Sequence, residues 1–381
     1  AHLDGLRVGG GANLRKLFER ELAEFEPAFP DQLVAIAAAL AIGEDYDPLR
    51  ELLVDDREPI RAAMVDGCLL GPDASLGGWL VGALAEASSA AVPDLLRLAL
   101  FGGVEVSIRD ALRSEDARVL RAALRFGRLG KVEAPVAEQW LPHAEPAVVA
   151  EAVVAGLHHG SRACWEKCRE LGLSDPASHP ELAWLVAAFG SGEDVGKLAA
   201  LVSDPEQGPD AVRALGLGGA VVGMEAVLGA LDAPEIRVAK LAGEAFSTMT
   251  GLELTEDQWS LAPPSTEPSD SDSDDEMEEL VPLLEEELLV PDAPALRAQW
   301  SKQADALVGA ERILGGAAKD AGAILAALRQ APNRRRHGLA LEFGVTTGGK
   351  GYVDTRARAA LQAVQIDAAA SAPVTVRRIG G

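Results

Sequence analysis

Residues 114–130 read SEDARVLRAALRFGRLG, and residues 144–160 read AEPAVVAEAVVAGLHHG. Each stretch begins with a short polar turn, continues with alanine, leucine and valine, and ends at a glycine. The same arrangement recurs at 174–190 (SDPASHPELAWLVAAFG) and 203–219 (SDPEQGPDAVRALGLGG). The third residues of successive turns lie 30, 30, 29 and 29 positions apart, at Asp116, Pro146, Pro176, Pro205 and Pro234. Such a period predicts an array of structural repeats.

Glycines supply a second marker of the same period. They end the successive units at Gly130, Gly160, Gly190, Gly219 and Gly251. Counting back, Gly102 and Gly71 extend the array upstream, with a degenerate unit around Ser88–Gly103. We therefore expect about seven units, each a pair of short helices that must stack on its neighbours to bury its apolar face.

This pattern resembles HEAT-type repeats, most closely the short bacterial form of about 30 residues. Ankyrin repeats have a similar period, but their Thr-Pro-Leu-His turn is missing here, and tetratricopeptide repeats run to about 34 residues with a Trp/Tyr pattern that is also missing. The resemblance implies an all-α fold, an α-solenoid of HEAT-like repeats.

Composition divides the chain into four predicted segments. Residues 1–42 are an N-terminal helical segment, and residues 43–254 are the repeat array. Residues 255–294 are a linker rich in Pro, Ser and acidic residues, in which dense like charge around 263–287 opposes burial. Residues 295–381 form a second helical block, with helices expected at 295–314, 319–331 and 333–345 and a basic tail.

Two further stretches resemble a narrower family. AHLDGLRVGG (1–10) and RRRHGLALEFGVTTGGKGYVDTRARAALQAVQ (334–365) are similar to an uncharacterised family of HEAT-repeat proteins from proteobacteria, myxobacteria especially. That resemblance places further residues before Ala1. It implies no known catalytic activity, and some members are encoded near type VI secretion genes.

Charge and cysteine content indicate which partners are disfavoured and in which compartment the protein is expected. The formal net charge is −24, which opposes non-specific binding to nucleic acid or anionic membrane. Three cysteines are too few for a disulfide framework, and the start of the chain lacks the charged region of a signal peptide. No apolar run reaches the length of a membrane span. We therefore predict a cytoplasmic protein.

The C-terminal segment from Arg329 reverses this charge, because it holds nine bases and three acids. Its bases can pair with the acidic linker or with an acidic surface of a partner. Nucleic acid is a weaker alternative, because no aromatic residues alternate with the bases. The candidate partner-binding residues are Arg334, Arg335, Arg336, Asp354 and Arg356.

Two glycine motifs resemble nucleotide sites. Gly344–Gly351 matches a phosphate-binding loop at seven positions, but Gly351 lacks the hydroxyl that binds magnesium, and a helix is expected before it rather than a strand. Gly216-Leu217-Gly218-Gly219 imitates a dinucleotide fingerprint, yet Gly219 already ends a repeat. We interpret the first as a turn and the second as structural, and we predict no cofactor.

A possible metal cluster comprises His158, His159, Cys164 and Cys168. The two cysteines share a helix face, and zinc favours such ligands. They lack the Cys-x-x-Cys spacing, however, and cysteine commonly packs in helix cores, so we predict no metal site.

These features favour a non-enzymatic protein-binding scaffold or adaptor, with a possible place in a secretion-related assembly, and we predict no catalytic residues. One alternative is a HEAT-like enzyme of the bilin lyase or alkylbase DNA glycosylase kind. The other is nucleic-acid binding through residues 329–381. A small-molecule substrate is not predicted, and neither the partner nor the oligomeric state follows from the sequence.

Overall fold

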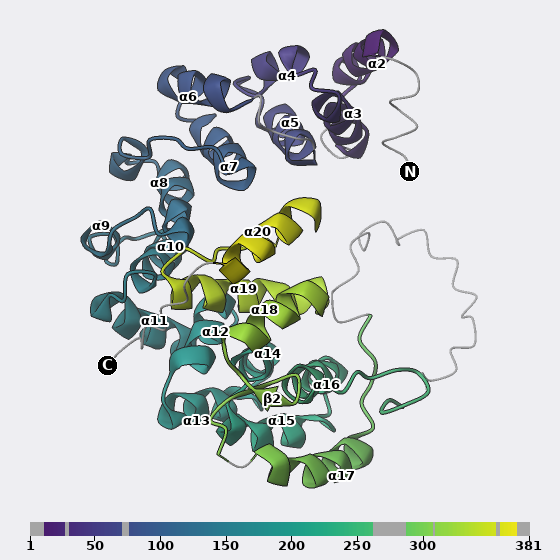
Figure 1. Ribbon diagram of the computed structural model, residues 1–381. Coiled ribbons are helices and arrows are strands. Elements are labelled where there is room, and N and C mark those ends of the chain that lie inside the picture. Colours follow the sequence, from purple (N-terminus) through teal and green to yellow (C-terminus); the bar gives the residue numbers. More distant parts are fainter. Residues whose placement is uncertain are drawn as a thin grey trace. The chain divides into compact units, whose positions relative to one another are not determined.

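The computed structural model describes residues 11–26, 30–70, 76–261, 287–307, 309–355 and 359–371. These residues are mainly helical, and successive helices pack on one another in chain order (Figure 1). A hairpin of β1 (Ile313–Leu314) and β2 (Ala317–Ala318) pairs antiparallel. The predicted all-α helical-repeat fold is therefore confirmed.

The helices have the following bounds. In the first half they are α2 (Gly11–Ala23), α3 (Asp31–Ile42), α4 (Asp47–Leu52), α5 (Glu58–Leu70), α6 (Gly77–Glu86), α7 (Val92–Gly102), η2 (Ala111–Arg113), α8 (Ala117–Leu124), η3 (Arg125–Leu129), α9 (Ala134–Glu138) and α10 (Pro146–Leu157). In the second half they are α11 (Arg162–Ser174), α12 (Pro180–Phe189), α13 (Gly192–Leu201), α14 (Gly208–Gly218), η4 (Val221–Gly223), α15 (Met224–Ala230), α16 (Ile236–Thr250), α17 (Ala293–Gln303), η6 (Ala304–Leu307), α18 (Ala321–Gln330), α19 (Asn333–Thr347) and α20 (Ala359–Ser371).

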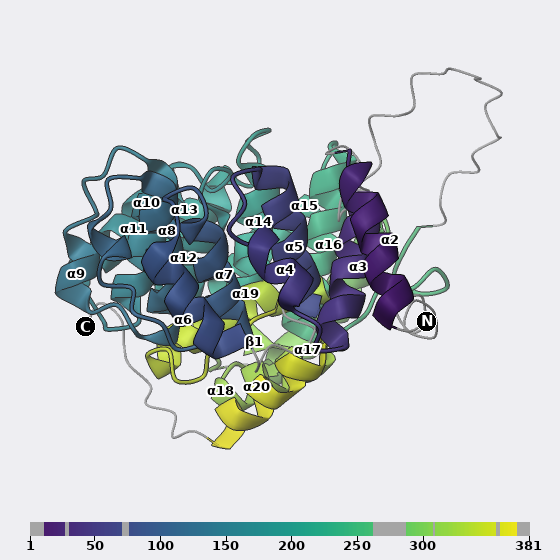
Figure 2. The same cartoon turned by 90° about the horizontal axis from the view of Figure 1, so that it is seen from above.

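The chain forms two compact units. Unit 1 comprises Ala1–Gly156 with Asp354–Gln365, and unit 2 comprises Leu157–Val353 with Ile366–Gly381. Within unit 1, α3 packs between α2 and α5 (Figure 2). Within unit 2, α14 packs between α12 and α16 (Figure 1). The division of the chain into four segments, at 1–42, 43–254, 255–294 and 295–381, remains a prediction.

The predicted polar turns join the two helices of a repeat. Ser114–Asp116 lies between η2 and α8, where the Asp116 carboxylate caps α8 by accepting from the Arg118 N–H at 2.9 Å. The other four turns lie before α10, between α11 and α12, between α13 and α14, and between α15 and α16. The repeat period therefore located the helix pairs correctly from residue 114 to residue 251.

Four of the five predicted end glycines adopt the left-handed conformation, with φ values of 68, 72, 72 and 75° at Gly130, Gly160, Gly219 and Gly251. Glycine has no Cβ penalty in this conformation, which commonly follows the last turn of a helix. Gly190 is the exception, at φ −69°. Upstream, the left-handed residue is Gly103 rather than Gly102, which is the last residue of α7.

Small residues let the second helices of neighbouring repeats approach closely. A Cβ added to Gly216 of α14 would lie 2.5 Å from the Ala245 Cβ of α16, and one added to Gly218 would lie 2.5 Å from the Ala187 Cβ of α12. Protein interiors pack too densely to absorb such a clash without movement. The dinucleotide-like motif is therefore a helix-packing surface, as predicted.

The predicted helix at 295–314 is wrong in its second half. Helix α17 ends at Gln303, and Ile313–Leu314 belongs to the hairpin instead. Gly309, Gly315 and Gly316 all have positive φ, which ends the helix and forms the turn of the hairpin. Contacts with α14 and α16, which a local pattern does not reveal, hold this segment in place.

Candidate functional site

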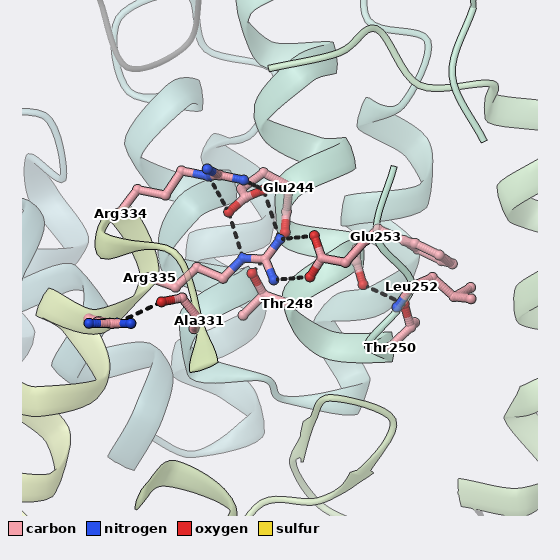
Figure 3. Close-up of polar contacts among 10 residues, drawn as sticks. Glu244, Thr248, Thr250, Leu252, Glu253, Ala331, Arg334 and Arg335 are labelled. Carbon is pink, nitrogen blue, oxygen red and sulfur yellow. Dashed lines mark hydrogen bonds and ion pairs between the residues drawn. The ribbon is translucent and has the colours of Figure 1, made fainter. Parts of the chain in front are cut away.

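Arg334 and Arg335 lie in the first turn of α19 and both contact Glu244 of α16 (Figure 3). The Glu244 carboxylate accepts from Arg334 Nε at 2.7 Å and from Arg335 Nε at 2.6 Å. Arg335 also donates through Nη1 to Glu253, just beyond α16, at 2.7 Å. These four residues, which we call the arginine–glutamate cluster, fasten α19 to α16.

Burial governs the electrostatics of this cluster. Removal from water acts to raise the pKa of Glu244, but hydrogen bonds from Arg335 and Arg334 outweigh it, so the pKa lies below its ordinary value. Burial likewise acts to lower the pKa of Arg335, and its bonds to Glu244 and Glu253 raise it instead. Both groups are therefore charged at neutral pH, and each satisfies the other.

A second set of contacts covers the C-terminal ends of α12, α14 and α16, the second helices of three successive repeats. Arg312 Nη2 donates to the Gly190 carbonyl after α12 at 2.6 Å, and Lys319 Nζ donates to the Leu217 carbonyl of α14 at 2.5 Å. The Gly315 N–H donates to Thr248 of α16 at 3.0 Å. The last carbonyls of a helix lack partners within it and favour nearby positive charge, so residues 310–319 cap all three helices.

The predicted partner-binding residues have different environments. Arg334 and Arg335 meet at Glu244, whereas Arg336 donates to the Ala331 carbonyl at 2.6 Å. Asp354 belongs to unit 1, where it is 3% exposed and its N–H donates to Gln365 Oε1 at 2.8 Å. Arg356 lies outside the described residues. Arg334 and Arg335 are thus joined to acids of α16 and its C-terminal flank, a pairing that the sequence analysis did not predict.

Little in the sequence indicates the role of the glutamates in this cluster. Glu244 interrupts the apolar run LAGEAFSTM (241–249), and a lone acid on a buried helix face is a usable signal, because a buried charge needs a partner. Arg312 and Lys319 offered no comparable signal. Their positions follow from the hairpin, which the sequence analysis missed.

Three members of the histidine and cysteine group, His158, Cys164 and Cys168, are part of the core, and His159 is half-buried. Cys164 and Cys168 are fully buried, as is Cys68 in unit 1, and burial raises the pKa of the Cys68 thiol to about 12. His158 is 1% exposed and its Nε2 atom lies 3.1 Å from where a Gly344 Cβ would be. Among the described residues, no three His, Cys, Asp or Glu side chains are grouped so that they could hold a metal ion.

The phosphate-loop-like stretch is the C-terminal end of α19. Gly344 to Thr347 form its last turn, and Gly348 follows in the left-handed conformation at φ 63°. Thr347 accepts from the Gly351 N–H at 2.9 Å, which closes the turn. A helix, not a strand, precedes this turn, as the sequence predicted.

Comparisons with known proteins add no family assignment. No family model and no curated protein matches the chain. Among solved structures, the crystal structure of an engineered protein is similar at 14% sequence identity over 93% of this chain and 81% of that chain, with a TM-score of 0.22. Separately, none of the described helices is long and apolar enough to cross a membrane.

Proposed function

We propose that the chain is a non-enzymatic scaffold or adaptor that binds another protein through its helical repeats. The supporting observation is that the repeats of unit 2 already hold a polypeptide segment that is not a repeat. Residues 310–347 lie against α12, α14 and α16 through main-chain hydrogen bonds and ion pairs. Such repeat surfaces commonly bind extended or helical polypeptides.

The buried charges favour binding over catalysis because they occur in matched pairs. Lys319 pairs with Glu342 at 2.6 Å, and in unit 1 Arg128 pairs with Glu151 at 3.2 Å. The cavity beside Glu244 has a volume of about 30 Å³, enough for a water molecule, but open grooves of about 510 and 550 Å³ lie elsewhere among the described residues. The pairing of the buried charges, rather than cavity size, therefore favours a scaffold over the lyase and glycosylase alternatives.

Nucleic-acid binding through residues 329–381 receives less support from the described part of that segment. Arg334 and Arg335 are engaged with carboxylates, and Arg329 pairs with Asp367 at 2.9 Å. Guanidinium groups must be available to phosphates for electrostatic binding to develop. A protein partner therefore remains the better proposal.

The proposal of a bacterial adaptor in a secretion-related assembly rests on residues 1–10 and 334–365. Their similarity to the myxobacterial-type HEAT-repeat family supports a bacterial, cytoplasmic adaptor in a secretion-related assembly. The three free cysteines fit a reducing compartment.

Affinity capture with the intact chain tests the scaffold proposal. We expect one or more proteins that bind in a saturable, stoichiometric manner, survive nuclease treatment and rebind as purified components. Capture of nucleic acid alone, or binding that nuclease abolishes, would contradict it. The intact chain is needed because α19 packs on α12 and α14, so a deletion of 329–381 would remove part of the core of unit 2.

A further inference from the structure

A groove of about 510 Å³ lies in unit 2 between two successive repeats, and we call it the turn groove. It is lined by the polar turns Ser203–Pro205 and Asp232–Pro234 and by residues of α13, α15 and α16. Among the lining residues, Val202, Ala230 and Val238 are buried. The turn groove therefore combines an apolar base with polar turns.

The charged residues that line the turn groove are all acidic: Asp204, Asp232 and Glu235. Asp204 Oδ1 accepts from the Glu206 N–H at 2.9 Å and from the Gln207 N–H at 3.0 Å, which closes its turn. Neither Asp204 nor Glu235 has an ion-pair partner among the described residues. Two carboxylates beside an apolar base are therefore open to a positively charged partner.

An arginine of this chain already shows how a guanidinium group binds at the third carboxylate. Arg297 of α17, which follows the last repeat helix, donates to both oxygens of Asp232 at 2.8 and 3.1 Å. Its Nη2 atom also donates to the Leu228 carbonyl of α15 at 2.8 Å. A carboxylate and a carbonyl near the end of a helix thus hold the planar guanidinium together. The turn Ser203–Pro205 has a carboxylate but no such arginine.

Acidic residues outnumber basic ones by 59 to 35 in the whole chain, so an exposed carboxylate by itself indicates little. The turn groove differs because its carboxylates adjoin an apolar base and because one of them already holds an arginine from outside the repeats. Arginine suits this combination, since its methylene stem covers apolar surface while its guanidinium forms two bonds to a carboxylate. Ile236, which follows Glu235, is 59% exposed and extends the apolar surface.

We propose that the turn groove binds an arginine-containing segment of a partner protein, with guanidinium groups paired with Asp204 and Glu235. Apolar side chains of the same segment pack against Val202, Ala230 and Val238. Charge complementarity identifies this occupant, because among the residues that line the groove the charged ones are acids. The inference rests on the proposed scaffold function and names its partner class.

The probe is a phage-displayed library of short random peptides, selected on the full chain. Selection should enrich peptides that combine two or more arginines with leucine or valine. Replacing these arginines by lysine should weaken binding about fivefold, because an ammonium group cannot form the paired bonds of a guanidinium.

Gly229 offers a variant that fills the groove without disturbing the fold. It lies in α15 and lines the groove, and a Cβ added there meets no heavy atom within 4 Å. Gly229→Gln should weaken the selected peptides about tenfold. Gly196→Gln is the matched control, because Gly196 of α13 has the same open space but does not line the groove. Both variants should keep or raise the unfolding midpoint, because glycine is unfavourable inside a helix.

A second variant removes the charge and keeps the shape. Asp204→Asn retains the oxygen that closes the turn, and Asp204→Asn/Glu235→Gln should weaken the peptides about tenfold. Glu256→Gln/Asp257→Asn removes the same net charge from exposed residues that do not line the groove. It should leave the affinity unchanged.

Four outcomes would overturn the proposal. They are enrichment of peptides without arginine, binding that survives Gly229→Gln, equal weakening by Asp204→Asn/Glu235→Gln and Glu256→Gln/Asp257→Asn, and equal binding of the lysine peptides. Self-association of the chain that Gly229→Gln abolishes would identify a second copy as the occupant instead, which also overturns it.

The two proposals fail separately. A captured protein that binds the Gly229→Gln variant normally would leave the scaffold function standing and exclude the turn groove. Selected arginine peptides that bind the turn groove, with no protein captured by the intact chain, would leave the groove and remove the scaffold function.

Discussion

Gly103 in unit 1 and Gly219 in unit 2 end second helices in the same conformation, at φ 69 and 72°. No heavy atom lies within 4 Å of a Cβ added to Gly103, whereas a Cβ on Gly219 would lie 2.2 Å from the Ile313 carbonyl oxygen. Gly251 resembles Gly219, with the Gly315 oxygen at 2.8 Å. Gly103 is required only because of its backbone angle. Gly219 and Gly251 are required for the same reason and also because residues 313–315 pack against them.

Removing the charge of Glu244 should cause the largest loss of stability, and that loss should fall on unit 2 rather than on unit 1. The variant Glu244→Gln leaves Arg335, whose side chain is 8% exposed, without its main partner. Breaking one side of a buried ion pair costs about 3 kcal/mol. We expect that loss in the free energy of unfolding of unit 2, measured by denaturant titration.

Glu253→Gln is the control for this variant. The Glu253 side chain is 57% exposed, and pairs with exposed partners contribute about 1 kcal/mol or less. Equal effects of the two substitutions would show that burial of the cluster is not what fastens α19.

Replacing Gly103 and Gly219 by alanine tests directly whether the hairpin adds a second constraint at Gly219. Gly103→Ala should destabilise the chain by about 1 kcal/mol, because the left-handed conformation disfavours a Cβ. Gly219→Ala adds the clash with Ile313 and should cost about 3 kcal/mol. If thermal and denaturant unfolding gave the same loss for both, the hairpin would not constrain the end of α14.

Acid should weaken the arginine–glutamate cluster. The pKa of Glu244 is lower in the folded chain than in the unfolded one, so its stabilisation is complete above the unfolded pKa and is lost as the pH falls through the folded value. The stability difference between wild type and Glu244→Gln should therefore shrink on acidification. A difference that stays constant from pH 7 to pH 3 would contradict the ionised pair.

Thiol labelling can show whether the two units open separately. The effect that it measures is the smallest of those predicted here. Cys68 reports on unit 1, and Cys164 and Cys168 report on unit 2; all three are buried. Burial raises the pKa of Cys68 to about 12 and also raises the pKa of Cys168, and all three thiols are buried, so labelling of the native chain should be slow. Glu244→Gln should accelerate labelling of Cys164 and Cys168 but not of Cys68. Equal acceleration, read by peptide mapping, would show coupled opening.

The parts of the fold that the sequence predicted are those encoded locally. Turns such as Ser203–Pro205 and glycines such as Gly219 repeat a local requirement, so their period located the helix pairs. The hairpin at 313–318 was missed because its conformation depends on hydrogen bonds to residues about 65 to 100 positions earlier. The helix predicted through Leu314 failed for the same reason.

The candidate site was predictable only in part. The basic run Arg334–Arg336 was visible, but its pairing with Glu244 depends on how α19 packs on the array. The sequence predicts a degenerate repeat around Ser88–Gly103, where α7 forms over Val92–Gly102 and the 3-residue η2 follows at Ala111–Arg113.

The hairpin is held largely by its main chain. Ile313 N–H donates to the Gly219 carbonyl at 2.8 Å, Gly316 N–H donates to Met249 at 2.9 Å, and the Glu311 carbonyl accepts from Val221 at 3.0 Å. Peptide groups are common to almost all residue types, so evolution can replace exposed side chains here, such as those of Ala317 and Ala318, without losing the attachment. A change in the number of residues would shift every bond at once. Among relatives, this segment should therefore drift in composition while keeping its length.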